Sequence, residues 1–200
     1  LPLRKQRFGR NECRGFFAGL LPDESKRRII ARNLGISARN DFAMLEQIGG
    51  ECAGAVTFMP EGQSLPEHEN SYRPLTGGEL AKLLRDLPRR PLMAGEEGVR
   101  LSLAGAQDKM AVHVDGGRIS LPLGPSPSTH ILKPAIEHYE GIVFNEALCM
   151  RLADAVGLPA AGTEIRQVEG IDFLLVERYD RRITAGPDGS PGLLEREHQE

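Results

Sequence analysis

A short run of small and polar residues in the middle of the chain has the types and spacing of a phosphate-binding loop. The run consists of Ala104, Gly105, Ala106, Gln107, Asp108 and Lys109, and it lies between two strand-like segments. Small side chains let backbone N–H groups approach an anion closely, and glycine also permits a positive φ. The run therefore predicts a loop that cradles nucleotide phosphates; a solvated turn of small residues is the alternative.

A lysine and a glutamate stand where a phosphate-transfer enzyme needs them. Lys133 ends an apolar strand predicted over 129–132, and Glu146 follows 146 − 133 = 13 positions later, near the start of a predicted helix over 141–156. Kinases bind phosphate oxygens with a strand lysine and orient it with a helical glutamate. The alternative is an exposed lysine and a glutamate placed favourably in the field of the helix dipole.

A third segment could hold a nucleotide base. Glu177, Arg178 and Tyr179 follow the apolar strand predicted over 173–176. At such a strand end a kinase holds adenine by backbone hydrogen bonds, and an aromatic side chain can cover the base. Taken alone, this segment is also consistent with a charged strand end. The order along the chain (loop, lysine, helical glutamate, base-binding segment) is the order found in kinases.

The elements that must position these residues change character near residue 98. The first part reads as helical, with helices near 11–21, 22–33 and 42–48, a short strand over 55–59, a loop over 60–74 and a helix capped by Thr76. Asn11, Asp23 and Asn40 are further candidate caps. We expect Lys26-Arg27-Arg28 to form a solvated helix face, although it could also be a partner surface.

The second part alternates in the manner of strands. Residues 109–114 and 118–121 form a predicted hairpin, 129–132 a further strand, and 163–168 with 173–176 a second hairpin. The helix over 141–156 is predicted to gather Val143, Phe144, Ala147, Leu148, Leu152 and Ala155 on one side, with Cys149 as a small buried side chain. The fold class is α+β: a helical subdomain over 1–98, a β-rich nucleotide-binding lobe over 99–182, and a connection over 183–200.

Composition narrows the class of protein. The 200 residues are 40% hydrophobic and 26% charged, which is typical of a soluble globular domain, and the net charge of −3 gives no sign of direct nucleic-acid binding. No apolar run is long enough to span a membrane. The three cysteines lack metal-ligand spacing, so we expect a cytoplasmic protein without a metal site in this chain. The chain begins with Leu1 instead of methionine, and we expect it to be part of a longer protein.

The sequence resembles the HipA family, the serine/threonine kinase toxins of bacterial toxin–antitoxin pairs. The resemblance covers most of the chain; its most specific part is Ser-x-Ala-Gly-Ala-Gln-Asp-Lys, ending at Lys109. It is carried by the segments 16–22, 49–55, 100–109, 129–133 and 176–182. It implies a protein-kinase-like N-lobe behind a helical subdomain, with ATP and Mg²⁺ as cofactors.

The resemblance also implies roles for single residues. Residues 104–109 would bind the ATP phosphates with Lys133, Glu146 would orient that lysine, and 177–179 would bind adenine. Ser102 matches the serine that family members autophosphorylate, and a phosphate there would add about −1.5 to −2 charges beside the loop and repel ATP; an ordinary sheet serine is the alternative. The expected partners are a HipB-like helix-turn-helix antitoxin, through which alone DNA is contacted, and a translation-associated substrate such as an aminoacyl-tRNA synthetase. No membrane partner is expected.

The groups that would complete catalysis are missing from this sequence. It contains neither Asp-x-x-x-x-Asn nor Asp-Phe-Gly, the patterns that supply a kinase with its catalytic aspartate and magnesium ligands. In the family these groups lie in a later helical lobe, so we expect no catalytic residue in this chain and no phosphoryl transfer by it alone. Three hypotheses remain: part of a HipA-like kinase, an inactive ATP- or antitoxin-binding module of that family, and an unrelated α+β domain.

Overall fold

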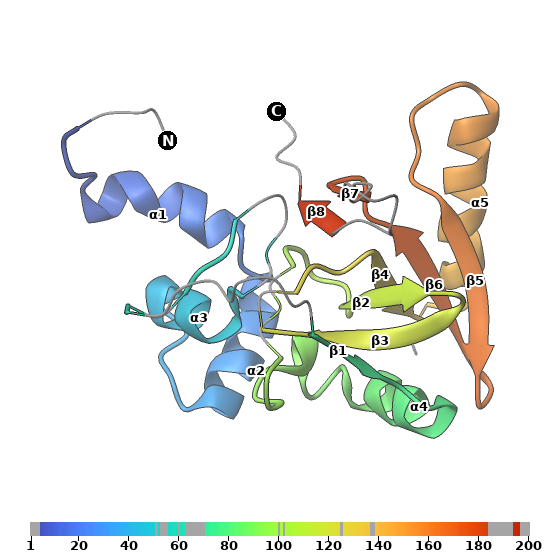
Figure 1. Ribbon diagram of the computed structural model, residues 1–200, viewed down its shortest axis with the longest axis horizontal. Coiled ribbons are helices and arrows are strands. Elements are labelled where there is room, and N and C mark those ends of the chain that lie inside the picture. The colour runs from blue at the N-terminus through green and yellow to red at the C-terminus, as the bar shows by residue number, and fades with distance from the viewer. Residues whose placement is uncertain are drawn as a thin grey trace, which may run out of the picture.

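An antiparallel sheet of six strands forms the centre of the protein (Figure 1). The computed structural model describes residues 5–50, 52, 56–59, 61–62, 71–99, 101, 103–124, 126–136, 139–183 and 194–196. The strand order is β1-β3-β2-β4-β6-β5. The strands are β1 (Ser71–Pro74), β2 (Met110–Asp115), β3 (Arg118–Leu123), β4 (His130–Pro134), β5 (Thr163–Val168) and β6 (Ile171–Glu177). A separate pair joins β7 (Arg181–Ile183) to β8 (Leu194–Arg196).

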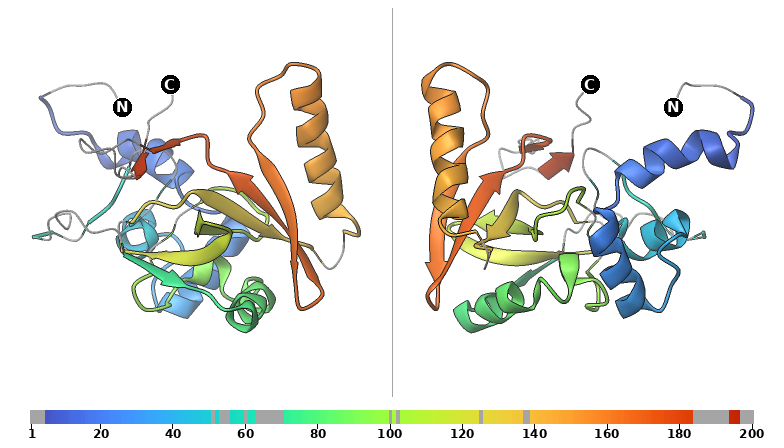
Figure 2. Two further views of the ribbon diagram at one scale, coloured as in Figure 1. Left: turned by 45° about the vertical axis from the view of Figure 1, so that its right-hand side comes forward. Right: turned by 180° about the vertical axis from the view of Figure 1, so that it is seen from behind.

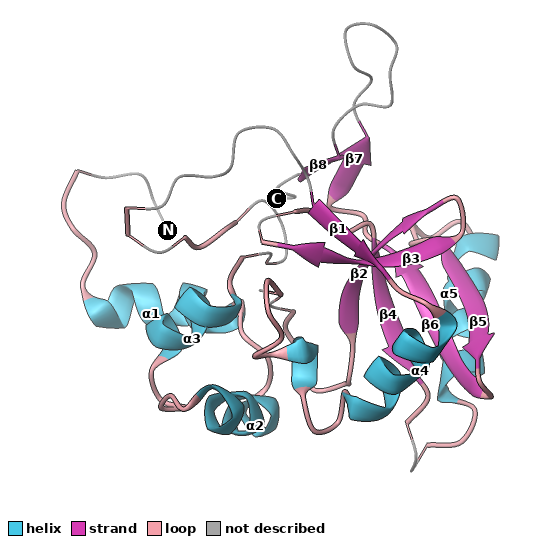
Figure 3. Ribbon diagram, turned by 60° about the horizontal axis from the view of Figure 1, so that its bottom comes forward, coloured by secondary structure: helices cyan, strands magenta, loops and turns pink. Residues whose placement is uncertain are grey.

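Helices surround this sheet in two groups. The described helices are α1 (Arg10–Gly19), α2 (Glu24–Leu34), α3 (Asp41–Ile48), α4 (Gly77–Asp86), the short 3₁₀ helix η1 (Pro91–Met93) and α5 (Ile142–Ala155). Helices α1 to α3 gather at one end of the molecule (Figure 3). Helix α5 stands apart from them, alongside β5 and β6 (Figure 2). None of the described helices is long and apolar enough to cross a membrane.

Local capping explains where most of these helices begin. Asp23 and Asn40 accept hydrogen bonds from the backbone N–H groups of the first turns of α2 and α3, and Thr76 forms a reciprocal capping box with Glu79. These caps agree with the sequence prediction. Helix α1 differs, because it begins at Arg10 with Gly9 as its cap, whereas Asn11 was the predicted cap. The Glu12 carboxylate accepts from the Gly9 N–H, so the cap is made from inside the helix.

One apolar core joins the helical end to the sheet. Side chains of α2, α3 and α4 pack in the same buried cluster as side chains of β2, β3, β4 and β6. Fully buried members include Ile30, Met44, Ile48, Leu87, Met110, Leu121, Leu132 and Phe173. A second, smaller cluster lies between α5 and the sheet and contains Val143, Ala147, Leu174 and Val176. The large apolar core therefore packs the helical end against the sheet. Helix α5 packs against the sheet through the smaller cluster.

Strand β1 lies in a stretch that the sequence predicts as a loop over 60–74. It pairs antiparallel with β3, with Tyr72 opposite Pro122, and so forms the edge of the central sheet. The predicted strand over 55–59 is not found in its described part, since residues 56–59 have no regular structure. The predicted change of domain at residue 98 therefore does not coincide with the edge of the sheet, which takes in residues 71–74.

The outer face of α5 differs from the prediction. Val143 and Ala147 are buried, but Phe144, Leu148 and Leu152 are 53%, 66% and 60% exposed. The apolar stripe is wider than the surface of the sheet that α5 covers, so four of its six predicted members, including Ala155, are exposed. Cys149 is also exposed, which corrects the prediction of a small buried side chain.

A half-buried histidine of β2 stacks on the edge strand. The rings of Tyr72 and His113 lie 3.9 Å apart at 18°, and the His113 Nδ1 is buried with no hydrogen-bond partner among the described residues. Burial lowers the pKa of His113 below its ordinary value of 6.5, and it lowers the pKa of His130 in the same way. Partial burial therefore favours the neutral form of both imidazoles in the folded protein.

We expect the free energy of unfolding to decrease as the pH falls below about 6.5. In this pH range the histidines of the unfolded chain bind protons more readily than His113 and His130 of the folded protein. Acidification therefore favours the unfolded state. Urea unfolding at pH 7.5 and pH 5.5 measures this loss. A His113→Phe variant keeps the stacking on Tyr72 and should lose less stability on acidification; an equal loss in both proteins would contradict the assignment to His113.

Candidate functional site

The predicted phosphate loop is an exposed turn that enters β2. Ala104, Gly105 and Ala106 are exposed, and Gly105 has a φ of +106°, which favours glycine. The Lys109 Nζ donates to the Ala104 carbonyl, closing the loop across its base. A Cβ on Gly105 would lie 2.8 Å from that Nζ. The backbone conformation therefore favours glycine, whereas the flexible Lys109 side chain could shift to make room for a Cβ.

Lys133 and Glu146 meet as the sequence predicts. Lys133 lies on β4 and its Nζ forms an ion pair with the Glu146 carboxylate of α5; the two side chains are 20% and 27% exposed. Lys109 is close enough that the charge of Lys133 contributes to the lowering of its pKa, after burial and against the opposite effect of Glu146. Two lysines and one glutamate therefore gather beside the loop and give it an excess of positive charge.

An apolar pocket of about 350 Å³ lies on the face of the sheet that carries Lys133. Ile131 lines it and stands two positions before Lys133 on β4, so both side chains point to one side of the strand. Met150 and Ala153 line it from α5, and they follow Glu146 at helical spacing. The remaining lining residues are Leu103, Pro159, Ala160, Ala161, Val176, Glu177, Arg178, Tyr179 and Asp180. The pocket thus runs from the base of the loop to the predicted base-binding segment.

Residues 177–180, where β6 ends, line one side of this pocket. The N–H groups of Glu177 and Arg178 donate to the carbonyls of Gly162 and Thr129, each at 2.9 Å, which fixes the path of the chain. The Glu177 carboxylate lies so close to Gly162 that a Cβ there would come within 2.7 Å of it. Tyr179 is 70% exposed and is one of the residues that line the pocket.

The Arg178 side chain has a structural role that the sequence analysis did not predict. Its guanidinium is buried and forms two hydrogen bonds with the Asp180 carboxylate, Nε at 2.9 Å and Nη2 at 2.7 Å. It also donates to the Ser128 hydroxyl at 3.1 Å and to the Cys52 carbonyl at 3.3 Å. This side chain joins distant segments and is therefore occupied within the protein. The sequence analysis did not predict the pair, which the Arg-x-Asp spacing could have indicated.

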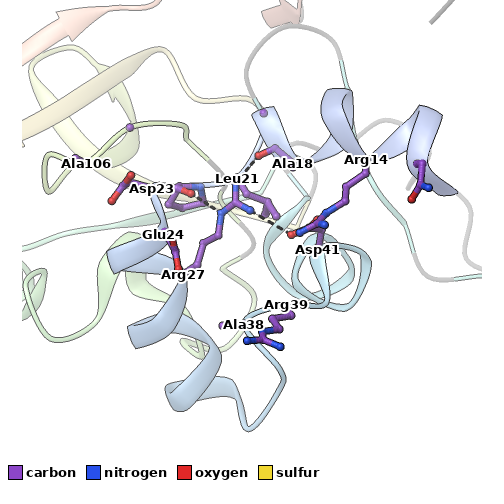
Figure 4. A pocket seen from close by; sticks show the side chains of 14 residues that line it. Arg14, Ala18, Leu21, Asp23, Glu24, Arg27, Ala38, Arg39, Asp41 and Ala106 are labelled. Atoms are coloured by element: carbon purple, nitrogen blue, oxygen red, sulfur yellow. Dashed lines mark hydrogen bonds and ion pairs between the residues drawn. The ribbon is translucent and has the colours of Figure 1, made fainter.

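A second, more polar pocket of about 990 Å³ lies between the helical end and the loop (Figure 4). Arg14 and Arg27 both point to the Asp41 carboxylate, at 3.0 and 3.2 Å, and Gly105 and Ala106 form the opposite wall. The sequence prediction of a solvated 26–28 face is therefore wrong for two of its three residues. Arg27 is partly buried, Lys26 pairs with Asp108 of the loop, and Arg28 alone extends into solvent beside Glu24.

Two predictions lie beyond these observations. Ser102, the predicted autophosphorylation site, is outside the described residues. Within the part of the chain that the structure describes, no group of three or more His, Cys, Asp or Glu side chains could hold a metal ion. The pocket and the Lys133–Glu146 pair do fit the base and phosphates of a nucleotide, because the pocket is apolar and the lysine stands beside the loop.

Comparison with known proteins gives a consistent result. The model of the HipA-like C-terminal domain matches residues 101–200, and that of the HipA N-terminal domain matches residues 1–59. The protein Y4mE of Sinorhizobium fredii is 47% identical over all of this chain and 47% of its own length. The serine/threonine-protein kinase toxin HipA of Shewanella oneidensis is 35% identical over 88% of this chain and 40% of that protein.

A solved structure shows the same fold. It is the complex of HipA, HipB and operator DNA from Shewanella oneidensis MR-1, and the matching chain has a TM-score of 0.71 at 33% identity. The match covers 92% of this chain and 41% of that chain. This chain therefore spans less than half the length of the relatives named here.

The buried Arg178–Asp180 pair predicts a strong effect on stability. We expect Asp180→Ala to lower the free energy of unfolding by about 3–5 kcal/mol, because it leaves the buried guanidinium groups of Arg178 and Arg181 without their carboxylate. Arg178→Ala should have a smaller effect, because Arg181 still pairs with Asp180. The melting temperature of Asp180→Ala should fall by roughly 10 °C, measured by circular dichroism. Arg28→Ala is the matched control on an exposed pair and should melt with the wild type; an equal effect of Asp180→Ala and Arg28→Ala would show that the buried pair is not needed.

Proposed function

The chain belongs to the HipA family, and we propose that it is the nucleotide-binding half of a serine/threonine kinase toxin of a toxin–antitoxin pair. One observation carries the proposal: the apolar pocket, the Lys133–Glu146 pair and the base of the loop share one face of the sheet. ATP has the same order of chemistry along its length, from a flat adenine base to an anionic triphosphate. The apolar pocket therefore suits the adenine end of ATP, and the lysine with the loop suits the phosphate end.

Each part of the site would perform one task in ATP binding. Adenine would enter the apolar pocket beside residues 177–179, with Tyr179 over it. Lys133 would bind phosphate oxygens, and Glu146 would keep its ammonium group in place. Backbone N–H groups of residues 104–106 would receive the remaining phosphate charge. Mg²⁺ is the expected companion of ATP, and it would neutralise the phosphate oxygens during transfer.

The wider biology is proposed by extension from the relatives. The solved relative is a HipA in complex with HipB and operator DNA. We propose a HipB-like helix-turn-helix antitoxin as partner, contact with DNA only through that antitoxin, and a translation-associated substrate such as an aminoacyl-tRNA synthetase. The protein would act in the cytoplasm, and autophosphorylation at Ser102 would repel ATP from the neighbouring loop.

A catalytically inactive module of the same family is the second candidate. It is favoured by one feature of the sequence, which contains no Asp-x-x-x-x-Asn and no Asp-Phe-Gly. Such a module would bind ATP or the antitoxin through the same surfaces without transferring phosphate. Phosphoryl transfer by the protein that contains this chain separates the two candidates.

We expect saturating Mg-ATP to stabilise the protein, by about 2.7 kcal/mol at 100 times the Kd, and to raise its melting temperature by roughly 5 °C or more. Lys133→Met should abolish most of this shift, because the phosphates lose their cationic partner while the side-chain stem stays. Differential scanning fluorimetry measures the shift. Lys82→Met, an exposed lysine on α4, is the matched control and should keep it; an Mg-ATP shift that survives in Lys133→Met would contradict the assigned site.

Autophosphorylation makes a separate prediction. The intact protein, purified after expression, should carry a phosphatase-sensitive mass increment of about 80 Da, one phosphate for one hydrogen. The increment should be absent from Ser102→Ala and present in Ser120→Ala, a serine of β3 that is outside the site. Intact-mass spectrometry with and without phosphatase measures it. A phosphate found elsewhere, or none after incubation with Mg-ATP, would remove Ser102 from the proposal.

A further inference from the structure

The phosphate loop is held from outside the sheet by the start of α2. Lys26 of α2 forms an ion pair with Asp108 of the loop across 82 positions of sequence, and the two side chains are 17% and 16% exposed. An ion pair that is mostly sheltered from water is less screened than a surface pair. This contact is therefore placed to act on the loop more strongly than an exposed ion pair.

Backbone contacts reinforce the same hold. Pro22 and Gly105 form a parallel bridge, and the Asp23 N–H donates to the Gly105 carbonyl at 3.3 Å. The loop thus has two attachments to the segment 22–26: a backbone one at Gly105 and a charged one at Asp108. They lie three residues apart, on either side of Ala106 and Gln107.

The segment 22–26 is itself anchored in the helical end. The Arg27 guanidinium donates to the carbonyl of Pro22 at 2.6 Å and to that of Ala18 at 2.5 Å, and it pairs with Asp41. Ile30, one turn further along α2, is fully buried in the shared core. The attachment at Asp108 therefore leads through α2 to the shared apolar core.

We propose that Lys26 is a positioning residue for the phosphate loop: through Asp108 it holds residues 104–109 in the geometry that receives nucleotide phosphates. The inference rests on the proposed nucleotide site and assigns part of its construction to the helical end. A loop of small exposed residues loses much backbone freedom when it closes on an anion. The Lys26–Asp108 pair removes part of that freedom before the nucleotide arrives, which improves affinity for the phosphates and leaves the base pocket unchanged.

The test compares two ligands that share a base and differ in phosphates. We expect Lys26→Ala to raise the Kd for Mg-ATP by roughly three- to tenfold and to leave the Kd for adenosine unchanged, measured by isothermal titration calorimetry. The charge-swapped double variant Lys26→Asp/Asp108→Lys should recover most of the Mg-ATP affinity. Arg28→Ala, on the same helix with an exposed ion pair, is the matched control and should bind both ligands as the wild type does.

Hydrogen exchange provides the second measurement. Amides of residues 103–109 should exchange several-fold faster in Lys26→Ala than in the wild type, without nucleotide present. If the wild type binds neither Mg-ATP nor adenosine, the proposed function fails, and this measurement still decides whether Lys26 holds the loop. The inference is overturned if loop exchange is unchanged in Lys26→Ala, if adenosine and Mg-ATP affinities fall together, or if the charge swap recovers no Mg-ATP affinity.

Discussion

Burial of one continuous apolar surface is the constraint on which the other features depend. Side chains of α2, α3 and α4 complete a core whose other half is contributed by the sheet. Ile30 and Phe173, 143 positions apart, are both almost fully removed from water in it. Because neither half can cover its apolar surface alone, the helical end and the sheet take up one relative placement. The loop contacts at Gly105 and Asp108 require that placement.

Charge is used in two different ways around this core. The Arg178–Asp180 pair is almost completely buried and is surrounded by further acceptors, so it fixes the chain where β6 leaves the sheet. The Lys133–Glu146 pair is about a quarter exposed, on the same side of β4 as Ile131 of the apolar pocket. A lysine in that position can exchange part of its contact with a carboxylate for contact with an incoming anion. The first pair builds the wall of the site, and the second remains open to a ligand.

Local sequence signals predicted much of the fold, and long-range contacts account for the differences. Caps at Asp23 and Thr76 and the turn at 115–118 act within a few residues, so they can be recognised in the sequence. The pairing of Lys133 with Glu146 was predicted because kinase-like spacing implies it. Strand β1 was predicted as a loop, because four residues become a strand only by pairing with β3 about 50 positions later. The attachment of Lys26 to Asp108 depends in the same way on tertiary placement.

The shared core has a consequence for the synthesis of the protein on the ribosome. Its members are far apart in order of translation: Leu21 precedes Phe173 by 173 − 21 = 152 positions. At about 5–20 residues per second, roughly 8–30 s pass between the emergence of the two. During that interval the nascent helices carry an apolar face that no strand yet covers. A cell that makes this protein must shield that face with a chaperone or tolerate its early association.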